Sequence, residues 1–343
     1  MEMTKTALLP CGGKNSRYPA GIPKYMRPMP DMRPMLSWAL DSIRHQVQRV
    51  CVAIRSDHDE AYGVANAIKS IEPMCDIAIL DRETNGPADT VAWMIEKMNI
   101  FGSVIVKDCD CDHVADAKDG NVVVATWREM AVGDRSEKSW ITVDNDTILT
   151  INEKSSPTDW FCCGSYQFAD ALEFLFHHDK IKASKNEVFC SHVISSMLSF
   201  GSTFKISKAS KSTDWGDFKK FLHWKRNKSV LMIDLDGTLC EAGSPYCGKS
   251  YDLVNPIPNA AIMLQKLKDQ GFYICITTAR PESSKSTTES WLLKYGFVFD
   301  RIIFGLPNTS RILVNDYAYS NPYPAAVAVN TKRDTGDWID MIF

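Results

Sequence analysis

Asp234-Leu235-Asp236-Gly237-Thr238 directly follows the apolar run Ser229-Val230-Leu231-Met232-Ile233. An apolar run of this length between polar residues is typical of a buried strand in a parallel sheet. Side chains two positions apart on a strand point to the same side, so the carboxylates of Asp234 and Asp236 would meet at the strand's end. This arrangement suits phosphate chemistry, with one carboxylate as nucleophile, the other for proton transfer, and a divalent cation between them.

The position of this stretch predicts another domain in front of it. A domain of this kind begins at its first strand, and about two thirds of the 343 residues precede Asp234. A chain of this length is expected to hold about two domains. The segment 218–227 is basic and polar, so we place a linker there and predict domains at 1–225 and 226–343.

The composition is that of an ordinary globular protein and disfavours several classes of protein, namely nucleic-acid-binding, membrane-spanning and disulfide-rich proteins. The net charge of −3 does not favour a nucleic acid partner. No apolar run reaches about 18 residues, which argues against a membrane span, and the first residues do not resemble a signal peptide. The 11 cysteines are odd in number and scattered, which favours reduced thiols and a cytoplasmic location. The sequence leaves open whether the chain forms a homo-oligomer.

Strand and helix patterns alternate through the chain, which predicts parallel α/β sheets. In the first part we expect strands at 6–10, 50–54, 77–80 and 103–107, with helices at 35–45, 59–70, 88–98, 169–177 and 189–200. Three closely spaced strands at 122–127, 140–143 and 148–152 predict an antiparallel insertion. In the second part we expect strands at 229–233, 273–277, 301–304 and 311–314, with helices at 259–270 and 287–295.

A glycine-rich loop follows the first predicted strand and reads Pro10-Cys11-Gly12-Gly13-Lys14-Asn15-Ser16-Arg17, with Pro23-Lys24 shortly after. Gly12 and Gly13 would let backbone N–H groups approach a phosphate closely. Arg17 and Lys24 would supply positive charge for a triphosphate and its transition state. The spacing matches neither the dinucleotide fingerprint nor the Walker loop. The alternative is a glycine turn beside two surface cations.

This loop resembles the signature loop of the sugar-1-phosphate nucleotidyltransferases, also called pyrophosphorylases, and the resemblance covers about residues 4–222. Further stretches follow in that family's order. They are a nucleobase-contacting segment with Gly86, Asp89 and Thr90; an aspartate segment, Lys107-Asp108-Cys109-Asp110; a sugar-contact motif with Glu153 and Lys154; a short glycine strand with Gly164; and a late turn with Asp214. The resemblance implies Mg²⁺ as cofactor, held by one aspartate from each acidic segment. Asp108 and Asp110 both qualify for the first position, and we favour Asp110, with Asp214 as the second ligand. The alternative is a solvated acidic loop.

The opening stretch resembles the first motif of the haloacid dehalogenase-like phosphatases. The resemblance implies that Asp234 is the nucleophile, that Asp236 is the general acid/base, and that Thr278 rather than Thr277 binds the phosphoryl group. It also implies that Asp234, Asp236 and Asp316 hold a metal ion, and the short span after Asp236 implies a minimal cap.

Two positions depart from this second pattern, because Leu306 stands where relatives often carry a lysine and Asn315 where they carry an acid. Lys285 or Arg280 could supply the missing charge. Otherwise the domain would bind a phosphorylated ligand without hydrolysing it.

Together the resemblances imply an α/β protein with two Rossmann-like domains, a nucleotidyltransferase-type mixed sheet followed by a haloacid dehalogenase-like parallel sheet. The implied enzyme transfers a nucleotidyl group from a nucleoside triphosphate to a sugar or polyol phosphate, and hydrolyses a phosphomonoester, for surface polysaccharide precursors. Two alternatives remain. The chain is a phosphatase with a degenerate sugar-phosphate-binding first domain, or a nucleotidyltransferase with a non-catalytic second domain. The sequence determines neither the base nor the sugar.

Overall fold

The structure is a computed structural model. It describes residues 5–128, 138–154, 158–226, 228–244, 246, 248–316 and 326–341. The chain divides into two compact units, Met1–Phe221 and Leu222–Phe343. Within the described residues, no helix has the length and apolar character that crossing a membrane requires.

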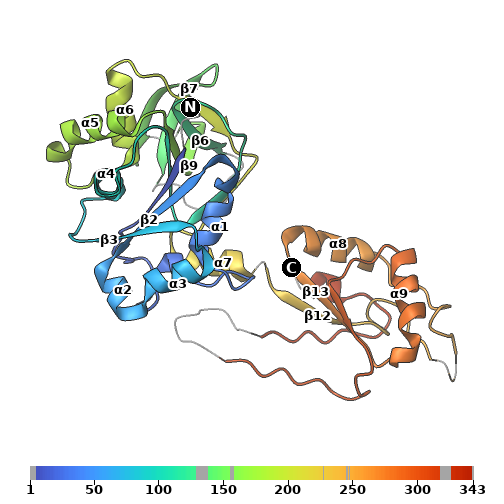
Figure 1. The fold of residues 1–343 in the computed structure, drawn as a ribbon. Coiled ribbons are helices and arrows are strands. Elements are labelled where there is room, and N and C mark those ends of the chain that lie inside the picture. Colours follow the sequence, from blue (N-terminus) through green and yellow to red (C-terminus); the bar gives the residue numbers. More distant parts are fainter. Residues whose placement is uncertain are drawn as a thin grey trace. The chain divides into compact units, whose positions relative to one another are not determined.

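A mixed sheet forms the centre of the first unit (Figure 1). Nine strands of the described residues join in the order β3-β2-β1-β4-β9-β6-β10-β8-β7. Their bounds are β1 Thr6–Cys11, β2 Arg49–Arg55, β3 Cys75–Leu80, β4 Val104–Lys107, β6 Val122–Trp127, β7 Ser139–Asp144, β8 Thr147–Glu153, β9 Trp160–Phe168 and β10 Lys205–Lys208. The strands β3, β2, β1 and β4 are mutually parallel, whereas β9 runs antiparallel to β4 and β6. The predicted mixed α/β architecture is therefore confirmed.

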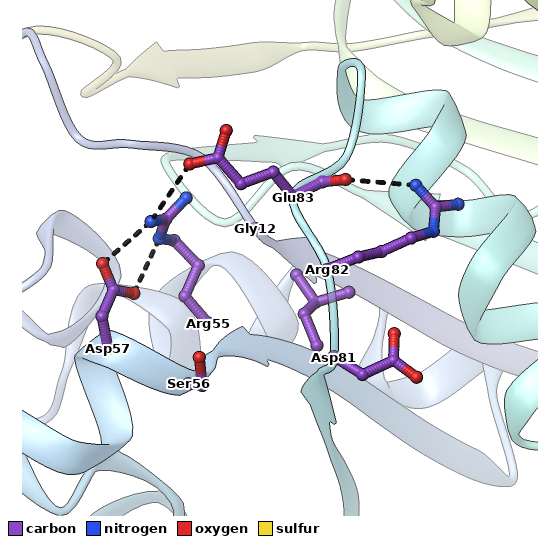
Figure 2. A pocket seen from close by; sticks show the side chains of 8 residues that line it. Gly12, Arg55, Ser56, Asp57, Asp81, Arg82 and Glu83 are labelled. Carbon is purple, nitrogen blue, oxygen red and sulfur yellow. Dashed lines mark hydrogen bonds and ion pairs between the residues drawn. The ribbon is translucent and has the colours of Figure 1, made fainter.

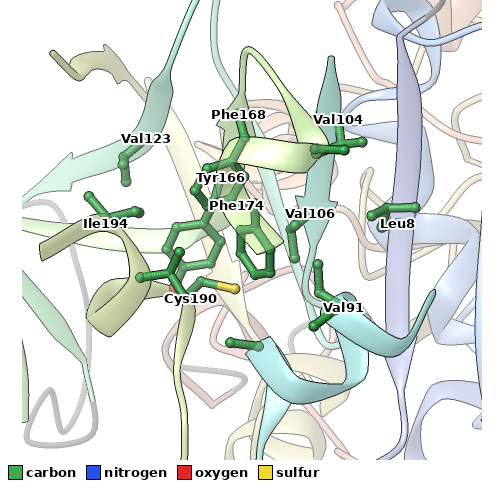
Figure 3. Packing of buried hydrophobic residues seen from close by; sticks show 14 of the residues in the cluster. Leu8, Val91, Val104, Val106, Val123, Tyr166, Phe168, Phe174, Cys190 and Ile194 are labelled. Carbon is green, nitrogen blue, oxygen red and sulfur yellow. The ribbon is translucent and has the colours of Figure 1, made fainter. Parts of the chain in front are cut away.

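Helices pack on both faces of this sheet. Side chains alternate along β1, so Leu8 joins one apolar core while Ala7 and Leu9 join the other. The first core (Figure 3) includes side chains of α4 Pro87–Lys97, α5 Ala171–Ile181 and α6 Cys190–Ser199. Its aromatic centre is the edge-to-face pair Phe168 and Phe174, with ring centroids 4.8 Å apart. The second core includes side chains of α1 Met35–Asp41 and α3 Val64–Ile71.

The predicted helix at 59–70 is interrupted. Gly63 adopts a left-handed conformation with φ of 59°, ends α2 (Ser56–Tyr62) and precedes α3. Glycine reaches this region without strain, so it commonly terminates a helix. The predicted helix at 35–45 ends at Asp41 and is followed by a short 3₁₀ turn at Arg44–Gln46.

The segment 218–227, where we placed the linker, is mostly helical and forms α7 (Phe218–Arg226). Asp217 caps the helix by accepting the N–H of Lys220 at 2.8 Å. Phe218 and Phe221 pack against the ring of Tyr18, with centroids 5.5 and 6.2 Å away. Aromatic packing thus orders a stretch whose other positions are mostly basic. The boundary between the two units falls inside this helix.

A short antiparallel ribbon that the sequence analysis did not predict joins β5 (Cys111–Val114) to β11 (Lys211–Asp214). In its register Asp214 lies opposite Cys111. The N–H of Trp215 also donates to the carbonyl of Asp110 at 2.7 Å. Two segments about a hundred residues apart in sequence are therefore held with Asp110 and Asp214 at the same end of the ribbon.

The second unit contains a parallel sheet in the order β12-β13-β14. The strands are β12 Val230–Asp234, β13 Tyr273–Thr277 and β14 Arg301–Ile303, and the helices are α8 Ala260–Gln270, α9 Lys285–Lys294 and α10 Trp338–Met341. The strand predicted at 311–314 is wrong. This stretch is extended but unpaired in the described structure, and Ile312 and Val314 are 86% and 89% exposed. Apolar β-branched residues favour a strand only where a neighbour supplies pairing and burial.

Gly86, like Gly164, combines a positive φ with a Cβ position already occupied by other atoms. It has φ of 107°, and a Cβ there would lie 2.7 Å from the carbonyl oxygen of Val188. We expect Gly86→Ala to lower Tm well beyond the matched variant Gly120→Ala, whose φ of 83° is also positive but whose surroundings are open. Backbone strain costs about 1–3 kcal/mol in either variant, and the collision adds to it only at Gly86. Thermal unfolding of both variants checks this, and equal losses would show that Val188 moves aside.

Candidate active site

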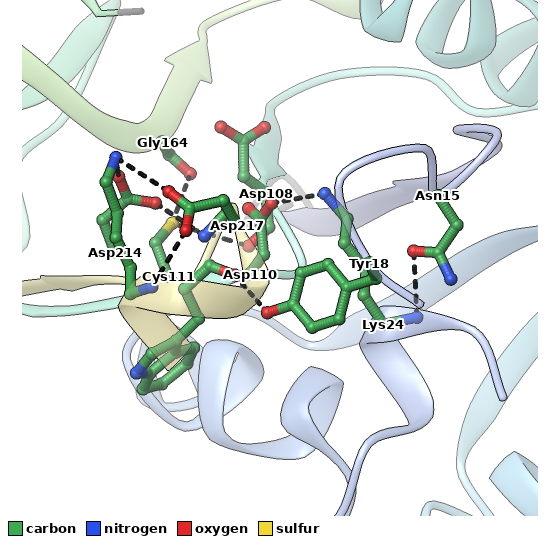
Figure 4. Close-up of polar contacts among 12 residues, drawn as sticks. Asn15, Tyr18, Lys24, Asp108, Asp110, Cys111, Gly164, Asp214 and Asp217 are labelled. Atoms are coloured by element: carbon green, nitrogen blue, oxygen red, sulfur yellow. Dashed lines mark hydrogen bonds and ion pairs between the residues drawn. The ribbon is translucent and has the colours of Figure 1, made fainter. Parts of the chain in front are cut away.

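The acidic residues that the sequence analysis selected in the first unit lie together at the end of the ribbon (Figure 4). Lys24 donates to Asp110 at 2.5 Å, and both side chains are about four-fifths buried or more. Both candidate metal ligands lie close to Gly216. A Cβ on Gly216 would lie 2.9 Å from Asp214 Oδ1 and 3.5 Å from Asp110 Oδ2. The structure thus brings Lys24, Asp110 and Asp214 together.

Lysines neutralise these carboxylates. Lys138 and Lys220 lie 2.9 and 3.1 Å from Asp214, whose other oxygen accepts the N–H of Gly216 at 2.8 Å. Burial by itself would raise the pKa of Asp214, but Lys138 and Lys220 bring that pKa well below its usual value. Likewise, burial raises the pKa of Asp110 and the ammonium of Lys24 outweighs it. Both carboxylates are therefore ionised at neutral pH, the state that a metal ion requires.

The donor set suits a hard divalent cation. Carboxylate oxygens of Asp108 and Asp110 and the thiol of Cys111 lie within 4.8 Å of one another, and Asp214 approaches from the other strand. Mg²⁺ binds through one or two carboxylates and keeps several waters. Asp108, Asp110 and Asp214 offer carboxylates of this kind. Burial, followed by the charge of Asp110, raises the pKa of Asp108 to about 6.

The glycine loop borders a small pocket at the carboxyl ends of β1, β2 and β3 (Figure 2). Its volume is about 140 Å³, and Gly12, Arg55 and Arg82 are among its lining residues. A Cβ on Gly12 would lie 2.8 Å from Leu80 and 3.0 Å from the hydroxyl of Thr90. Gly13 has open space around it, and Arg17 is exposed.

The predicted nucleobase segment is largely occupied by contacts within the protein. Asp89 accepts two hydrogen bonds from Arg82, at 2.9 and 3.0 Å, and one from the N–H of Asn85 at 2.8 Å. Thr90 contacts the hydroxyl of Thr84 at 2.7 Å. Gly86, described above, packs against the backbone of Val188. These three residues do not line the pocket described here, although Gly12 does.

Of the predicted sugar-contact residues, Glu153 ends β8 and Lys154 follows it directly, while the predicted glycine strand is β9, which contains Gly164. Glu153 accepts hydrogen bonds from Ser139 at 2.5 Å and Ser191 at 2.6 Å. Lys154 has φ of 49° and places its ammonium 5.2 Å from the ring centre of Phe189. Gly164 lies beneath the aspartate loop, where a Cβ would come within 2.6 Å of Asp108 and Cys111.

Several charged groups of this centre were missed from the sequence. Lys138 and Lys220 lie far from any glycine loop in sequence, and only the fold brings them to Asp214. Tyr18 is buried and donates its hydroxyl proton to the carbonyl of Trp215, which ties the glycine loop to the late turn. Its position directly after Arg17 was the one feature of the sequence that could have indicated a role for Tyr18.

In the second unit, Asp234 is the last residue of β12 and Asp236 follows two positions later, so both lie at the strand's end as predicted. Arg280 is 1% exposed and donates to both oxygens of Asp236, at 2.7 to 3.1 Å. Thr278 donates to the same carboxylate at 3.2 Å, whereas Thr277 turns to the carbonyl of Ile233. The structure thus brings Thr278 to Asp236, and Arg280 orients that carboxylate.

Asp234 has a different neighbour. Arg311 lies 3.1 Å from its Oδ1, and burial raises the pKa of Asp234 despite this guanidinium. Asp316 is exposed and follows the segment 311–314 that was expected to be a strand, and no described contact joins it to Asp234. Arg311 was missed because its charge reaches Asp234 from a stretch expected to lie inside a strand.

Solved structures similar to the chain share the fold of its first unit. A nucleoside-diphosphate-sugar pyrophosphorylase from Vibrio cholerae RC9 is 16% identical, with a TM-score of 0.56 over 64% of this chain and 99% of its own. The inositol-1-phosphate CTP transferase from T. maritima is 12% identical, with a TM-score of 0.52 over 64% of this chain and 92% of its own. The fold is that of a nucleotidyltransferase. No protein-family model matches the chain, and no curated protein matches it in sequence.

His113, on the ribbon, should make the first unit sensitive to acid. It is 4% exposed, and neither ring nitrogen has a hydrogen-bond partner in the structure. Burial lowers its pKa to about 3. Between pH 6.5 and 3 the unfolded chain therefore binds a proton that the folded chain does not, and stability falls as the pH falls through this window, by at most about 1.4 kcal/mol per pH unit. We expect His113→Phe to lose less Tm than wild type between pH 7 and 4, whereas His223→Phe, at an exposed position, should follow wild type. An unchanged pH dependence in His113→Phe would contradict this.

Proposed function

We propose that Met1–Phe221 transfers a nucleotidyl group from a nucleoside triphosphate to a sugar or polyol phosphate and releases pyrophosphate. One observation carries the proposal: Lys24, Asp110 and Asp214 form a single cluster, although they come from segments far apart in the chain. The glycine loop that carries Arg17 is tied to the same turn, since Phe218 donates its N–H to the carbonyl of Arg17 at 3.2 Å. The nucleotidyltransferase fold is consistent with this chemistry and does not by itself establish it.

In this reaction a phosphate oxygen of the acceptor bonds to the α-phosphorus, and the bond to the β-phosphate's bridging oxygen breaks. Pyrophosphate leaves with that oxygen. The enzyme's task is alignment and charge stabilisation. Mg²⁺ held by Asp110 and Asp214 would neutralise phosphate charge. Lys24 and Arg17 stabilise the negative charge of the departing pyrophosphate, and the N–H groups near Gly12 and Gly13 orient the nucleotide.

The acceptor is a phosphorylated polyhydroxy compound. The sugar-contact residues Glu153 and Lys154 adjoin the centre through the backbone, because the N–H of Lys154 donates to the carbonyl of Lys138 at 3.1 Å. The neighbours include one protein described as acting with a nucleotide sugar and one with a polyol phosphate, inositol 1-phosphate. A sugar or polyol phosphate is therefore the acceptor class to screen.

Asp110→Asn should abolish most nucleotidyl transfer. Losing one charged group at a transition state costs on the order of 10²–10³ in rate. Pyrophosphate release is measured with Mg²⁺, each nucleoside triphosphate, and a panel of sugar 1-phosphates and polyol phosphates. Asp146→Asn is the matched control, since Asp146 also pairs with a lysine, Lys208, at 2.7 Å but lies outside the cluster. Full activity in Asp110→Asn would overturn the assignment of the cluster.

A second activity, phosphomonoester hydrolysis by Leu222–Phe343, is favoured by the geometry at β12. Asp234 is partly accessible beside Arg311, while Thr278 and Arg280 fix Asp236. In the proposed reaction an oxygen of Asp234 bonds to phosphorus while the alcohol leaves with a proton from Asp236. Water then attacks the phosphorus and returns a proton to Asp236, so that phosphate leaves and the Asp234 carboxylate is restored. Such an enzyme could trim a bisphosphorylated sugar before nucleotidyl transfer, as precursor synthesis for a surface polysaccharide would require. Mg²⁺ ligation by Asp234, Asp236 and Asp316 is part of the same proposal.

Asp234→Asn should remove phosphate release and leave pyrophosphate release unchanged, because only the first step of hydrolysis needs this carboxylate as nucleophile. Inorganic phosphate is followed with sugar bisphosphates and with a chromogenic phosphomonoester. Asp252→Asn, which changes an exposed carboxylate bonded to Ser250, is the control. If wild type releases no phosphate but a phosphorylated sugar raises its Tm, and Asp234→Asn loses that rise while Asp110→Asn keeps it, the second unit is a binding module. Phosphate release that persists in Asp234→Asn would exclude this nucleophile.

A further inference from the structure

Lys107, the last residue of β4, is buried completely, with 0% of its surface exposed. Its ammonium donates to the carbonyl oxygens of Asp108 at 3.0 Å and Cys111 at 2.8 Å, and more weakly to that of Gly164 at 3.4 Å. The sulfur of Cys111 lies 2.8 Å away. None of these four partners is a carboxylate, which is unusual for a buried lysine.

These partners belong to the loop that carries the candidate metal ligand. The residues Asp108 and Cys111 flank Asp110 on either side, and both present their carbonyls to the same ammonium. Gly164, on β9, contributes the third carbonyl around the ammonium. The same carbonyl also accepts the N–H of Asp108 at 2.9 Å. The loop therefore wraps around the Lys107 ammonium as carbonyl groups wrap around a bound cation.

The energetic balance shows what the ammonium does there. Burying a charge is costly unless polar groups surround it. Here the carbonyl oxygens of Asp108, Cys111 and Gly164 surround the ammonium and replace the water that burial removes. Removing the charge would leave two carbonyls without their donor, at a cost of about 1–3 kcal/mol each. The loop conformation and the charged lysine therefore stabilise each other.

Lys107 does not contact a substrate, because it has no exposed surface. Its influence reaches the reaction through Asp110. The same loop is closed on the other side by the N–H of Trp215, which donates to the carbonyl of Asp110 at 2.7 Å. With the backbone held at these two contacts, the carboxylate of Asp110 lies against Lys24 and on the side of Gly216 where Asp214 also lies.

We propose that Lys107 is a positioning residue, whose buried ammonium holds the loop Asp108–Cys111 so that Asp110 faces Asp214 before any metal arrives. The inference rests on the proposed function, which places a divalent cation at Asp110 and Asp214. Groups that orient metal ligands in this way change metal affinity by about 10- to 100-fold when they are lost. The opposing effect, repulsion between the ammonium and the cation, is weaker because the loop's own carbonyls lie against the ammonium.

The test is Mn²⁺ binding by the full chain without substrates, followed by the electron paramagnetic resonance signal of free Mn²⁺. Lys107→Met, close in shape but uncharged, should bind about 10- to 100-fold more weakly than wild type. Lys118→Met is the matched control, since Lys118 also donates to a backbone carbonyl, that of Ile206 at 2.6 Å, away from the cluster. Its affinity should equal that of wild type. Asp110→Asn should lose the site.

The outcomes separate the two proposals. Saturable binding that is lost in Asp110→Asn but unchanged or tighter in Lys107→Met would overturn the role of Lys107 and leave the metal site standing. Wild type that binds no Mn²⁺, or Asp110→Asn that binds as wild type does, would overturn the proposed metal site and this inference with it.

Lys107→Met could also fail to fold, so a measurement on wild type is paired with the titration. Hydrogen exchange of the metal-free chain should show the amides of Asp108 and Trp215 protected, with little change when Mn²⁺ is added, because the loop is already formed. Exchange at the unprotected rate in the metal-free chain, followed by protection on adding Mn²⁺, would show that the metal rather than Lys107 orders the loop. That result would overturn the proposal without any variant.

Discussion

Charge that is withdrawn from water is the constraint on which the candidate site depends. Carboxylates and ammonium groups from four separate segments share a small volume, where each buried charge depends on polar or oppositely charged partners. The groups are Lys24, Lys107, Asp108, Asp110, Lys138 and Asp214. Sheet, ribbon and late turn can thus be understood as the scaffold that brings these groups together. A metal ion and phosphates would bind at a centre in which lysines already neutralise the carboxylates. On binding they would replace some of these ion pairs rather than create the site.

The sequence was sufficient for the elements whose pattern is local. The strands of the parallel half and the helix α4 follow from apolar periodicity, and the residues Asp110 and Asp214 follow from the order of short motifs. The α7 helix was missed because its apolar positions are few and its order depends on the ring of Tyr18, two hundred residues away. Lys138 was not predicted as a site residue either, because its role depends on the contact with Asp214, which is distant in sequence. A surface lysine and a lysine bound to a buried carboxylate have the same local sequence, and only tertiary contacts distinguish them.

In the second unit, three candidate site residues could be predicted from local sequence. Asp234, Asp236 and Thr278 could be predicted because each lies at or just after a strand's end, where sheet geometry alone sets direction. The segment 311–314 has a strand's composition, yet pairing is a property of two segments and cannot be deduced from one. Arg280 and Arg311 are residues of the second unit whose partners could not be predicted. Both were visible as charges, but which carboxylate each would meet depended on backbone paths between them.

Gly164 places a limit on how this protein can diverge. Its position has φ of 74° and no room for a side chain, since Asp108 and Cys111 lie against it. A lineage that enlarged Cys111 would press on Gly164, and one that replaced Gly164 would displace the loop around Lys107. These positions should therefore change together or not at all. Among natural homologues, an uncharged residue at position 107 should be accompanied by a different residue at position 111, so that the history of the family records a contact that no single sequence reveals.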